Sequence, residues 1–151
     1  MGCGKSVIGS ELAVKLGLKF IDLDSFIEDN EQQSISNIFS DKGDIYFRNI
    51  ETIYLNKILD NYDNIVLSLG GGTPCYNDNM NTIISSKNQS FYLKNSNIQL
   101  SKRLFIQNKF RPIISEIKTE EKLIEFVSKH LFEREIFYSK ASCVIDCNKE
   151  T

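Results

Sequence analysis

Three consecutive residues near the start of the chain, Gly4, Lys5 and Ser6, have the types and the order that end a phosphate-binding loop. In such a loop, backbone N–H groups and the start of the following helix surround the phosphates. The lysine reaches the β- and γ-phosphates, and the serine hydroxyl binds Mg²⁺. The alternative is a chance tripeptide before a helix, because the first glycine of the motif would lie before residue 1. The small Cys3 and the helical pattern after Ser6 favour the phosphate-binding loop.

Two carboxylates, Asp22 and Asp24, close the stretch "KFIDLD" (19–24), which we predict to be a short strand. Residues two apart lie on one face of a strand, so both side chains would point the same way at its end. There they could hold Mg²⁺ and accept a hydroxyl proton. The alternative, which is favoured for an isolated pair of this kind, is that Asp24 only caps the next helix with Ser25.

Arg48 and Glu51 lie one helical turn apart in a predicted amphipathic helix. The functional interpretation is that Glu51 orients the Arg48 side chain. The alternative is a solvated pair on the helix surface, which would have a small energetic effect.

The glycine run Gly70, Gly71 and Gly72 follows an apolar stretch that is typical of a buried strand. Three glycines permit positive φ angles and leave no side chain in the way, so a ligand can approach the backbone closely. A merely flexible turn is the alternative, although a flexible turn explains one glycine better than three.

The elements that must position these residues alternate between strand and helix. Apolar spacing predicts helices over 7–16, 34–39, 44–59, 77–85, 97–106 and 119–139, and strands over 19–24, 64–69, 90–94 and 141–147. Gly17 is the predicted cap after the first of these helices. This alternation indicates an α/β fold with a parallel sheet. Ligands of such folds bind beyond the carboxyl ends of the strands, where all four groups of residues fall.

Composition restricts the possible partners. The 151 residues carry 18 Lys and Arg against 20 Asp and Glu, a net charge of −2, so no overall basic field would hold nucleic acid or an anionic membrane. No apolar run reaches the length of a membrane span. The four cysteines lack paired metal-ligand spacing and there is one histidine, which argues against zinc and for a reduced cytoplasmic setting.

Taken in order along the chain, these motifs resemble the shikimate kinases. The resemblance rests on "GCGKSVIG", "FIDLDSFIE", "GDIYFRNIE", "LSLGGGTPCYN", "YLK", the Arg-Pro pair at 111–112 and "KHLFEREIFYSKA". It implies a three-layer P-loop kinase fold with strand order 2-3-1-4-5, as a single domain over 1–151. It also implies substrate-binding helices over 25–60 and a mobile lid over 107–118. The implied reaction is the ATP-dependent phosphorylation of the shikimate 3-hydroxyl.

The resemblance also implies a role for each matched position. ATP and Mg²⁺ would be bound by the loop and the residues around it, namely Gly2, Cys3, Gly4, Lys5, Ser6, Val7 and Arg111, with Ser6 and Asp22 at the metal. Shikimate would be bound by Asp24, Arg48, Gly70, Gly71, Gly72 and Arg134, the two arginines gripping its carboxylate. Catalysis would depend on Lys5, Asp24 and Arg111.

The resemblance further implies a cytoplasmic monomer whose partner is shikimate, with no nucleic acid and no membrane. The central strand that feeds the phosphate-binding loop, and a closing C-terminal helix, are absent between residues 1 and 151. We therefore expect an apolar strand upstream of Met1 in a longer protein. The alternative function is that of an inactive nucleotide- or metabolite-binding remnant of a P-loop kinase.

Overall fold

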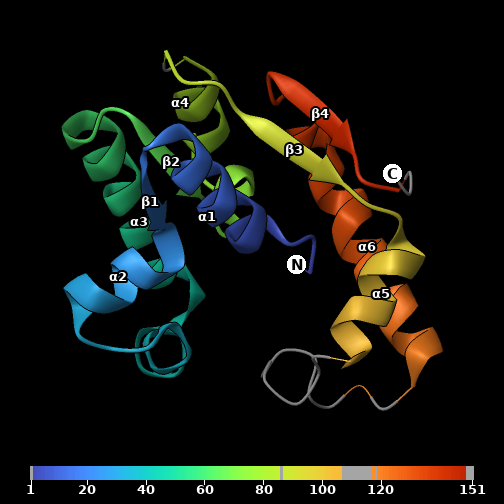
Figure 1. The fold of residues 1–151 in the computed structure, drawn as a ribbon. Coiled ribbons are helices and arrows are strands. Elements are labelled where there is room, and N and C mark those ends of the chain that lie inside the picture. Colours follow the sequence, from blue (N-terminus) through green and yellow to red (C-terminus); the bar gives the residue numbers. More distant parts are fainter. Residues whose placement is uncertain (1, 86, 107–116, 118, 149–151) are drawn as a thin grey trace. The chain divides into compact units, whose positions relative to one another are not determined.

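The computed structural model describes residues 2–85, 87–106, 117 and 119–148 (Figure 1). The chain divides into two compact units, Gly4–Asn88 and a second unit that joins Met1–Cys3 to Gln89–Thr151. We call them the N-terminal unit and the C-terminal unit. Except for Ile117, the predicted lid over 107–118 lies outside the described residues, as does Arg111.

A parallel pair of strands lies within the N-terminal unit. β1 (Lys19–Asp22) pairs with β2 (Ile65–Ser68) in a register that sets Asp22 beside Ser68. α1 (Lys5–Leu16) precedes β1 and contacts both strands. It is bounded by Gly4 and Gly17, whose φ angles of 85° and 67° are left-handed. The predicted helix end at Gly17 is confirmed, because glycine adopts this conformation without a Cβ clash.

Two helices follow that were predicted to carry substrate contacts, α2 (Leu23–Glu31) and α3 (Ile35–Asn61). Ser34 caps α3 by accepting a hydrogen bond from the Asn37 N–H at 3.2 Å, as expected for a helix start at this serine. α3 combines the helices predicted over 34–39 and 44–59, joined across Gly43 with φ 80° and ψ 175°. This backbone conformation favours glycine, and it lets the second part of α3 take its own direction.

Beyond β2, the glycine turn leads into a short 3₁₀ helix, η1 (Thr73–Cys75), and then into α4 (Asn79–Ser85). Apolar side chains from β1, α2, α3 and α4 form the core of the N-terminal unit. They are Ile21, Leu23, Ile27, Ile38, Phe47, Ile50, Leu55, Ile58 and Ile83. Burial of each such side chain stabilises the fold by roughly 1.5–3 kcal/mol, so this core holds α2 and α3 firmly against β1.

The C-terminal unit repeats the parallel pairing. β3 (Phe91–Lys94) pairs with β4 (Cys143–Asp146), and α5 (Asn97–Ile106) packs against α6 (Glu120–Tyr138). Thr119 caps α6 by accepting from the Lys122 N–H at 3.4 Å. Among the described residues of this unit, the buried apolar side chains are Leu100, Leu104, Leu123 and Val127.

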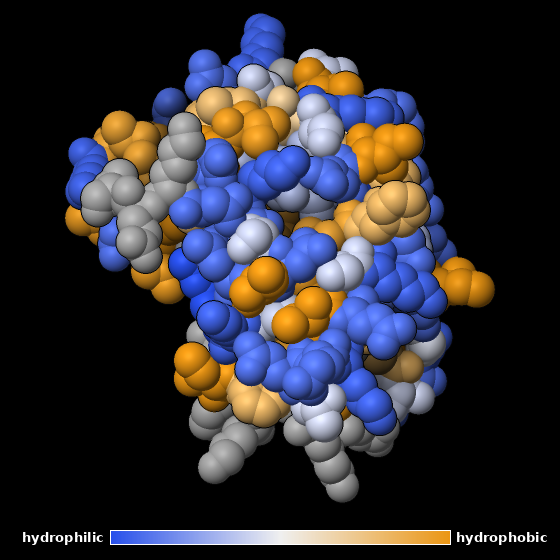
Figure 2. Space-filling view, turned by 90° about the vertical axis from the view of Figure 1, so that its right-hand side faces the viewer, coloured by the Kyte–Doolittle hydropathy of each residue, from blue (hydrophilic) through white to orange (hydrophobic). Residues whose placement is uncertain are grey.

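One face of the molecule carries separate apolar patches among hydrophilic residues (Figure 2). Large exposed apolar side chains of the C-terminal unit include Phe132 and Ile136, which lie on α6. Within the described ranges, no helix combines the length and hydropathy that crossing a bilayer requires.

The predicted α/β class with parallel strands is confirmed. The strands predicted over 19–24 and 64–69 pair with each other, and so do those predicted over 90–94 and 141–147. The described strands form two two-stranded sheets. One prediction was wrong in detail, because β1 ends at Asp22 and the following residues already belong to α2. The single domain, the sheet order 2-3-1-4-5 and the upstream strand stay predictions.

Candidate active site

The start of α1 has the features of an anion site. Gly4 is its N-terminal cap and makes no side-chain capping bond, and the first turn holds no acidic residue. The first N–H groups of a helix have no partner within the helix, and its dipole makes this end positive. Lys5 adds a full charge, and its ammonium donates to the Ser6 hydroxyl at 3.5 Å. Backbone and side chain together therefore suit a phosphate group.

Three oxygen-bearing side chains meet beside this helix start. The Ser6 hydroxyl donates to Asp22 Oδ2 at 2.8 Å, and it lies 3.4 Å from the Ser68 hydroxyl. Asp22 and Ser68 are partners in the β1–β2 ladder and end their strands at the same edge. Hydroxyl and carboxylate oxygens are hard ligands of the kind that Mg²⁺ takes. Ser6 and Asp22 therefore fit a magnesium ion that keeps water or phosphate as its other ligands.

A metal site built from protein side chains alone would require a cluster of several ligating residues. Among the described residues, no group of three or more His, Cys, Asp or Glu side chains could hold a metal ion.

Asp22 and Asp24 do not share a strand face, which corrects the sequence-based expectation. Asp22 is the N-terminal cap of α2, and its Oδ1 accepts from the Asp24 N–H at 3.1 Å. Aspartate is a strong helix cap, so the strand stops there and its two-residue alternation no longer applies. The alternative that made Asp24 the capping residue is wrong as well, because Asp22 has that role. The Asp24 carboxylate instead faces the glycine turn, with Oδ1 2.9 Å from the position of a Cβ on Gly70.

The environment of Asp24 disfavours its ionised form. Burial raises the pKa of this carboxyl, and the negative charges of Asp22, Glu51 and Glu28 raise it further, while Lys5 opposes them. A carboxylate with a raised pKa is a better proton acceptor than an ordinary aspartate. Perturbed carboxyl groups of this kind concentrate at functional sites.

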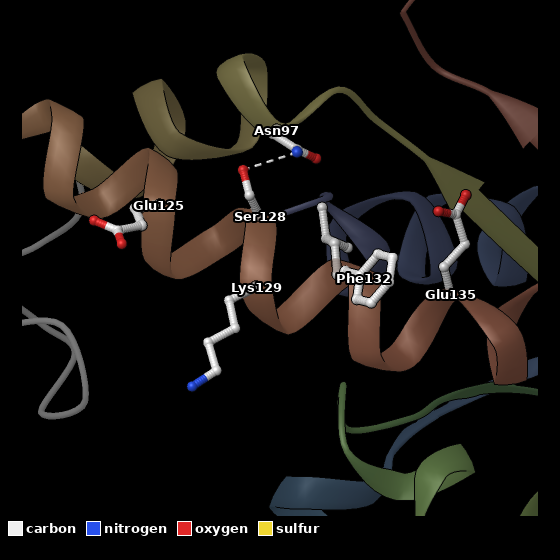
Figure 3. Close-up of a pocket in the computed structure, with 7 residues that line it drawn as sticks. Asn97, Glu125, Ser128, Lys129, Phe132 and Glu135 are labelled. Atoms are coloured by element: carbon white, nitrogen blue, oxygen red, sulfur yellow. Dashed lines mark hydrogen bonds between the residues drawn. The ribbon is translucent and has the colours of Figure 1, made fainter.

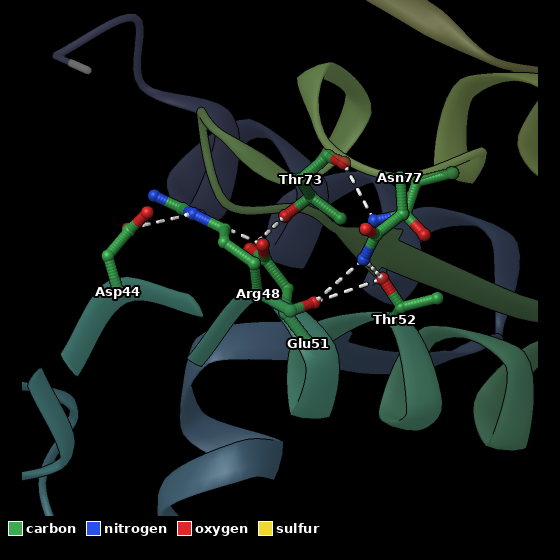
Figure 4. Close-up of polar contacts among 7 residues, drawn as sticks. Asp44, Arg48, Glu51, Thr52, Thr73 and Asn77 are labelled. Atoms are coloured by element: carbon green, nitrogen blue, oxygen red, sulfur yellow. Dashed lines mark hydrogen bonds and ion pairs between the residues drawn. The ribbon is translucent and has the colours of Figure 1, made fainter. Parts of the chain in front are cut away.

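The pair predicted at Arg48 and Glu51 is not a solvated surface pair (Figure 4). The Glu51 side chain is 1% exposed, and its Oε2 accepts from Arg48 Nη1 at 2.9 Å. Arg48 Nε also donates to Asp44 Oδ1 at 3.3 Å. Burial opposes the charge on Arg48, but the hydrogen bond and the negative charge of Glu51 outweigh it and raise the Arg48 pKa. The guanidinium is therefore charged and held on two sides.

Thr73 completes this network from the other side of the glycine turn. Its buried hydroxyl donates to Glu51 Oε1 at 2.5 Å, while its carbonyl accepts from Asn79 Nδ2 at 2.9 Å (Figure 4). Both oxygens of Glu51 therefore have a donor, which a buried carboxylate requires.

Glycine is needed at two positions of the turn because the side chains of Asp24, Glu51 and Arg48 lie very close to its backbone. A Cβ on Gly70 would lie 2.9 Å from Asp24 Oδ1 and 3.0 Å from Glu51 Oε1. A Cβ on Gly72 would lie 2.6 Å from Arg48 Nη1. None of the three glycines has a positive φ, so the expectation based on backbone freedom was wrong for this turn. A flexible turn does not explain these contacts, because side chains are packed against both glycines.

Val7 lies on α1 with an exposed side chain, and the remaining predicted residues lie in the C-terminal unit or outside the described residues. Gly2 has a φ of 72°, and Cys3 packs against the core of that unit. Arg134 lies on α6 and lines a small hollow with His130 and Tyr138. In the N-terminal unit, the structure brings together Lys5, Ser6, Asp22, Asp24, Arg48 and Glu51 around β1, β2 and the glycine turn.

Sequence reasoning missed three side chains of this site. Asp44 is four residues before Arg48, so helical spacing could have identified it. Ser68 ends a strand whose partner ends at Asp22, a signal that depends on the register. Thr73 lies 22 residues from Glu51, and no sequence pattern connects the two.

A larger hollow lies in the C-terminal unit, with a volume of about 520 Å³ (Figure 3). It is lined by Asn97, Glu125, Ser128, Lys129, Leu131, Phe132 and Glu135. Asn97 Nδ2 donates to Ser128 Oγ at 2.8 Å across it. None of the described residues with a predicted role lines this hollow. Although it is the larger of the two hollows, it is therefore not the predicted site of ATP or shikimate binding.

Comparison with known proteins gives consistent matches. The family described as shikimate kinase matches residues 1–151. A shikimate kinase of Azobacteroides pseudotrichonymphae genomovar. CFP2 is 41% identical over 151 residues, which are 100% of this chain and 88% of that protein. A crystal structure of shikimate kinase from Bacteroides thetaiotaomicron has a TM-score of 0.90 and 33% identity, covering 97% of this chain and 81% of that chain. The shikimate kinase from Acinetobacter baumannii in complex with shikimate has a TM-score of 0.84 and 28% identity, covering 99% and 80%.

Proposed function

The chain belongs to the shikimate kinase family, and on that premise we propose that it transfers the γ-phosphoryl group of ATP to the 3-hydroxyl of shikimate. The products are shikimate 3-phosphate and ADP. The observation that carries the proposal is the charged guanidinium of Arg48, held by the buried carboxylate of Glu51 at 2.9 Å against the turn that also touches Asp24. Positioning and charge neutralisation, rather than covalent help from the protein, drive such a transfer.

The nucleotide end of the proposal rests on α1. The free N–H groups of its first turn and the Lys5 ammonium bind the β- and γ-phosphates. Gly2, Cys3, Gly4 and Val7 contribute backbone groups to the same loop. Ser6 and Asp22 hold Mg²⁺, which neutralises charge between the phosphates when it is bound. This assignment is supported by the oxygen pair of Ser6 and Asp22 at 2.8 Å.

The acceptor end rests on Asp24 and the glycine turn. Asp24 accepts a hydrogen bond from the 3-hydroxyl of shikimate, orients the oxygen toward the γ-phosphorus, and takes its proton as the new bond forms. Its raised pKa supports this role, because burial has already made the ionised carboxylate a stronger base. Backbone groups at Gly70, Gly71 and Gly72 contact the ring.

Arg48 binds the shikimate carboxylate through paired N–H groups, a geometry that a planar guanidinium provides and an ammonium does not. Arg134 grips the same carboxylate, and Arg111 in the lid over 107–118 stabilises charge on the moving phosphoryl group. For Arg111 and Arg134 the support is the family resemblance. We also propose that the enzyme acts as a cytoplasmic monomer, without a nucleic-acid or membrane partner.

A coupled assay of ADP release tests the proposal. The purified protein receives ATP and Mg²⁺ with shikimate, with gluconate or with nucleoside monophosphates. We expect turnover with shikimate and none above background with the other acceptors. A protein that binds nucleotide but turns over none of these acceptors would instead be an inactive remnant.

The acceptor assignment has its own matched pair of variants. Arg48→Ala should raise the shikimate KM about 10- to 100-fold, the size of a lost charge-assisted hydrogen bond, and leave the ATP KM within twofold. The control is Lys57→Ala, which removes an exposed cation from the same helix. Equal shikimate KM values in the two variants would refute the role of Arg48.

A further inference from the structure

We infer that Tyr76 is a positioning residue, whose ring fixes the plane of the Arg48 guanidinium and so restricts its free edge to planar carboxylates. The second half of this inference rests on the proposed function of Arg48. Tyr76 lies just beyond η1, and neither the motifs nor the hydrogen-bond network around Glu51 assigns it a role.

The rings around Arg48 cover the faces of its guanidinium. Arg48 Cζ lies 4.2 Å from the centre of the Tyr76 ring, against 5.0 Å for Phe47 and 5.8 Å for Phe39. A cation over an aromatic face is attracted by the ring quadrupole within about 6 Å of the centre, and the attraction grows as the distance falls. Tyr76 therefore makes the closest ring contact of the three.

The segment that carries Tyr76 is fastened to α3 at the same place. Asn77 Nδ2 donates to Thr52 Oγ1 at 2.7 Å and to the Arg48 carbonyl at 3.3 Å (Figure 4). Asn77 has a φ of 50°, a conformation that asparagine tolerates better than most residues. The Tyr76 carbonyl accepts from the Asn79 N–H at 3.3 Å, at the start of α4. The backbone that carries the ring is thus held by the hydrogen bonds of Asn77 and Asn79.

The edges of the guanidinium show where a ligand can bind. Nε donates to Asp44, and Nη1 donates to Glu51. Within the described part of the chain, Nη2 donates to no acceptor. A Cβ on Gly72 would lie 3.0 Å from Nη2, so the glycine keeps this edge clear.

These contacts together select the shape of the ligand. With Tyr76 and the phenylalanine rings beside its faces, the guanidinium offers only in-plane N–H groups from Nη2 and the second hydrogen of Nη1. A planar carboxylate matches two parallel in-plane donors. Without the Tyr76 ring, the guanidinium can tilt as a rigid plane, and the two remaining donors no longer point in one fixed direction within the site.

Two variants distinguish the effect of the Tyr76 aromatic ring from the effect of its hydroxyl group. Tyr76→Leu removes the aromatic face but keeps an apolar side chain, and Tyr76→Phe keeps the face and removes the hydroxyl. Tyr76 is 37% exposed, so neither change opens a buried cavity. Thermal unfolding of both variants provides the check that the fold is retained.

The first measurement needs no ligand. Nitrogen-15 spectra of arginine side chains report rotation of the Arg48 guanidinium, with its signals assigned by their loss in Arg48→Lys. We expect separate Nη1 and Nη2 signals in the wild type and in Tyr76→Phe, and averaged signals in Tyr76→Leu. Signals in Tyr76→Leu that match those of the wild type would overturn the inference, whatever the substrate of the enzyme.

The second measurement concerns the ligand. We expect Tyr76→Leu to raise the shikimate KM about 5- to 20-fold, the range of a partly buried cation–π contact, with kcat and the ATP KM within twofold. Tyr76→Phe should stay within twofold of the wild type throughout. An equal shikimate KM in Tyr76→Leu would overturn the inference while the wild-type turnover still supports the proposed function. If the wild type does not turn over shikimate, the proposed function fails, and the ligand-free spectra still decide whether Tyr76 positions Arg48.

Discussion

Glu51 Oε2 lies 2.9 Å from Arg48 Nη1, one helical turn away on α3, and this carboxylate is almost completely buried. The Arg48 side chain is 15% exposed, so one member of the pair is inside the protein and the other reaches its surface. A buried carboxylate is expensive unless it is paired and hydrogen-bonded, and Glu51 is both. The pair therefore fixes a cation that still has N–H groups to offer a ligand.

Glu51→Gln should destabilise the protein by about 3 kcal/mol, because removing one charge of a buried pair leaves the other uncompensated. The shikimate KM should rise as Arg48 loses its orientation. The matched control is Asp44→Asn, since Asp44 binds the same guanidinium but is 53% exposed. That variant should lose less than about 1 kcal/mol, as surface pairs do. Urea unfolding measures both variants, and equal losses would contradict the difference drawn from burial.

Gly72→Ala should mainly weaken acceptor binding. Its Cβ would lie 2.6 Å from Arg48 Nη1, so the guanidinium must move away from its present position. We expect the shikimate KM to rise about tenfold with a small change in kcat, since a displaced charge-assisted hydrogen bond is lost from binding. Steady-state kinetics with saturating ATP provides the measurement.

The comparison for this prediction is Gly70→Ala. The new Cβ would lie 2.9 Å from Asp24 Oδ1, so this variant should lower kcat as well as raise the shikimate KM. The same kinetic profile in the two variants would show that the turn does not separate the roles of Asp24 and Arg48.

Asp24→Asn should lower kcat by about 100-fold or more, the usual effect of losing a general base. It should also stabilise the protein at pH 7. Burial raises the folded-state pKa of Asp24 above its ordinary value of 3.8, so the proton is bound more tightly in the folded state. The resulting stabilisation of the wild type is complete below that ordinary value and is lost as the pH rises through the raised pKa.

Urea unfolding at several pH values checks the sign of this effect. The variant should exceed the wild type in stability at pH 7, and the gap should narrow as the pH falls toward the ordinary carboxyl value of 3.8. Asp29→Asn, an exposed position on the same helix, is the control and should show no such gap. A variant less stable than the wild type at pH 7 would contradict the stated environment of Asp24.

Ser6→Ala should raise the Mg²⁺ concentration needed for nucleotide binding by about tenfold, since it removes one hard oxygen ligand. Titration calorimetry of ADP at varied Mg²⁺ measures this without turnover. Ser10→Ala is the matched control, because its hydroxyl donates only to the Val7 carbonyl of the same helix at 2.9 Å. An unchanged Mg²⁺ requirement in Ser6→Ala would place the ion elsewhere.

Arg111→Ala should lower kcat more than it raises the shikimate KM, since the charge of Arg111 is needed most as the phosphoryl group moves. Arg134→Ala should do the reverse and raise the shikimate KM, as expected for a ligand of the carboxylate. Initial rates over a grid of ATP and shikimate concentrations distinguish the two outcomes. If the two variants changed kcat and the shikimate KM in the same way, Arg111 and Arg134 could not be assigned different roles.

Local chemistry alone was enough to predict much of this protein. The glycine after α1 and the helical spacing after Asp44 depend on neighbours in the chain, and both were found as predicted. The parallel pairing of the strands also followed, because strands that alternate with helices have few other ways to bury both faces. The order of motifs was sufficient to indicate the family.

Other features were decided by tertiary structure. Nothing in the spacing of Arg48 and Glu51 distinguishes a buried pair from a solvated one; the packing of Thr73 and the glycine turn over α3 decides it. Of the two properties expected of Gly70 and Gly72, positive φ angles are absent, whereas the lack of a Cβ is what the contacts require. Asp22 and Asp24 were expected on one face of a strand, but Asp22 caps α2 and Asp24 lies within it. A helix cap at Asp22 ends the strand, so strand alternation does not reach Asp24. The contact between Tyr76 and Arg48 could not be predicted from the sequence. The two residues are 28 positions apart, and a contact of that kind depends on how the elements pack rather than on any periodic pattern.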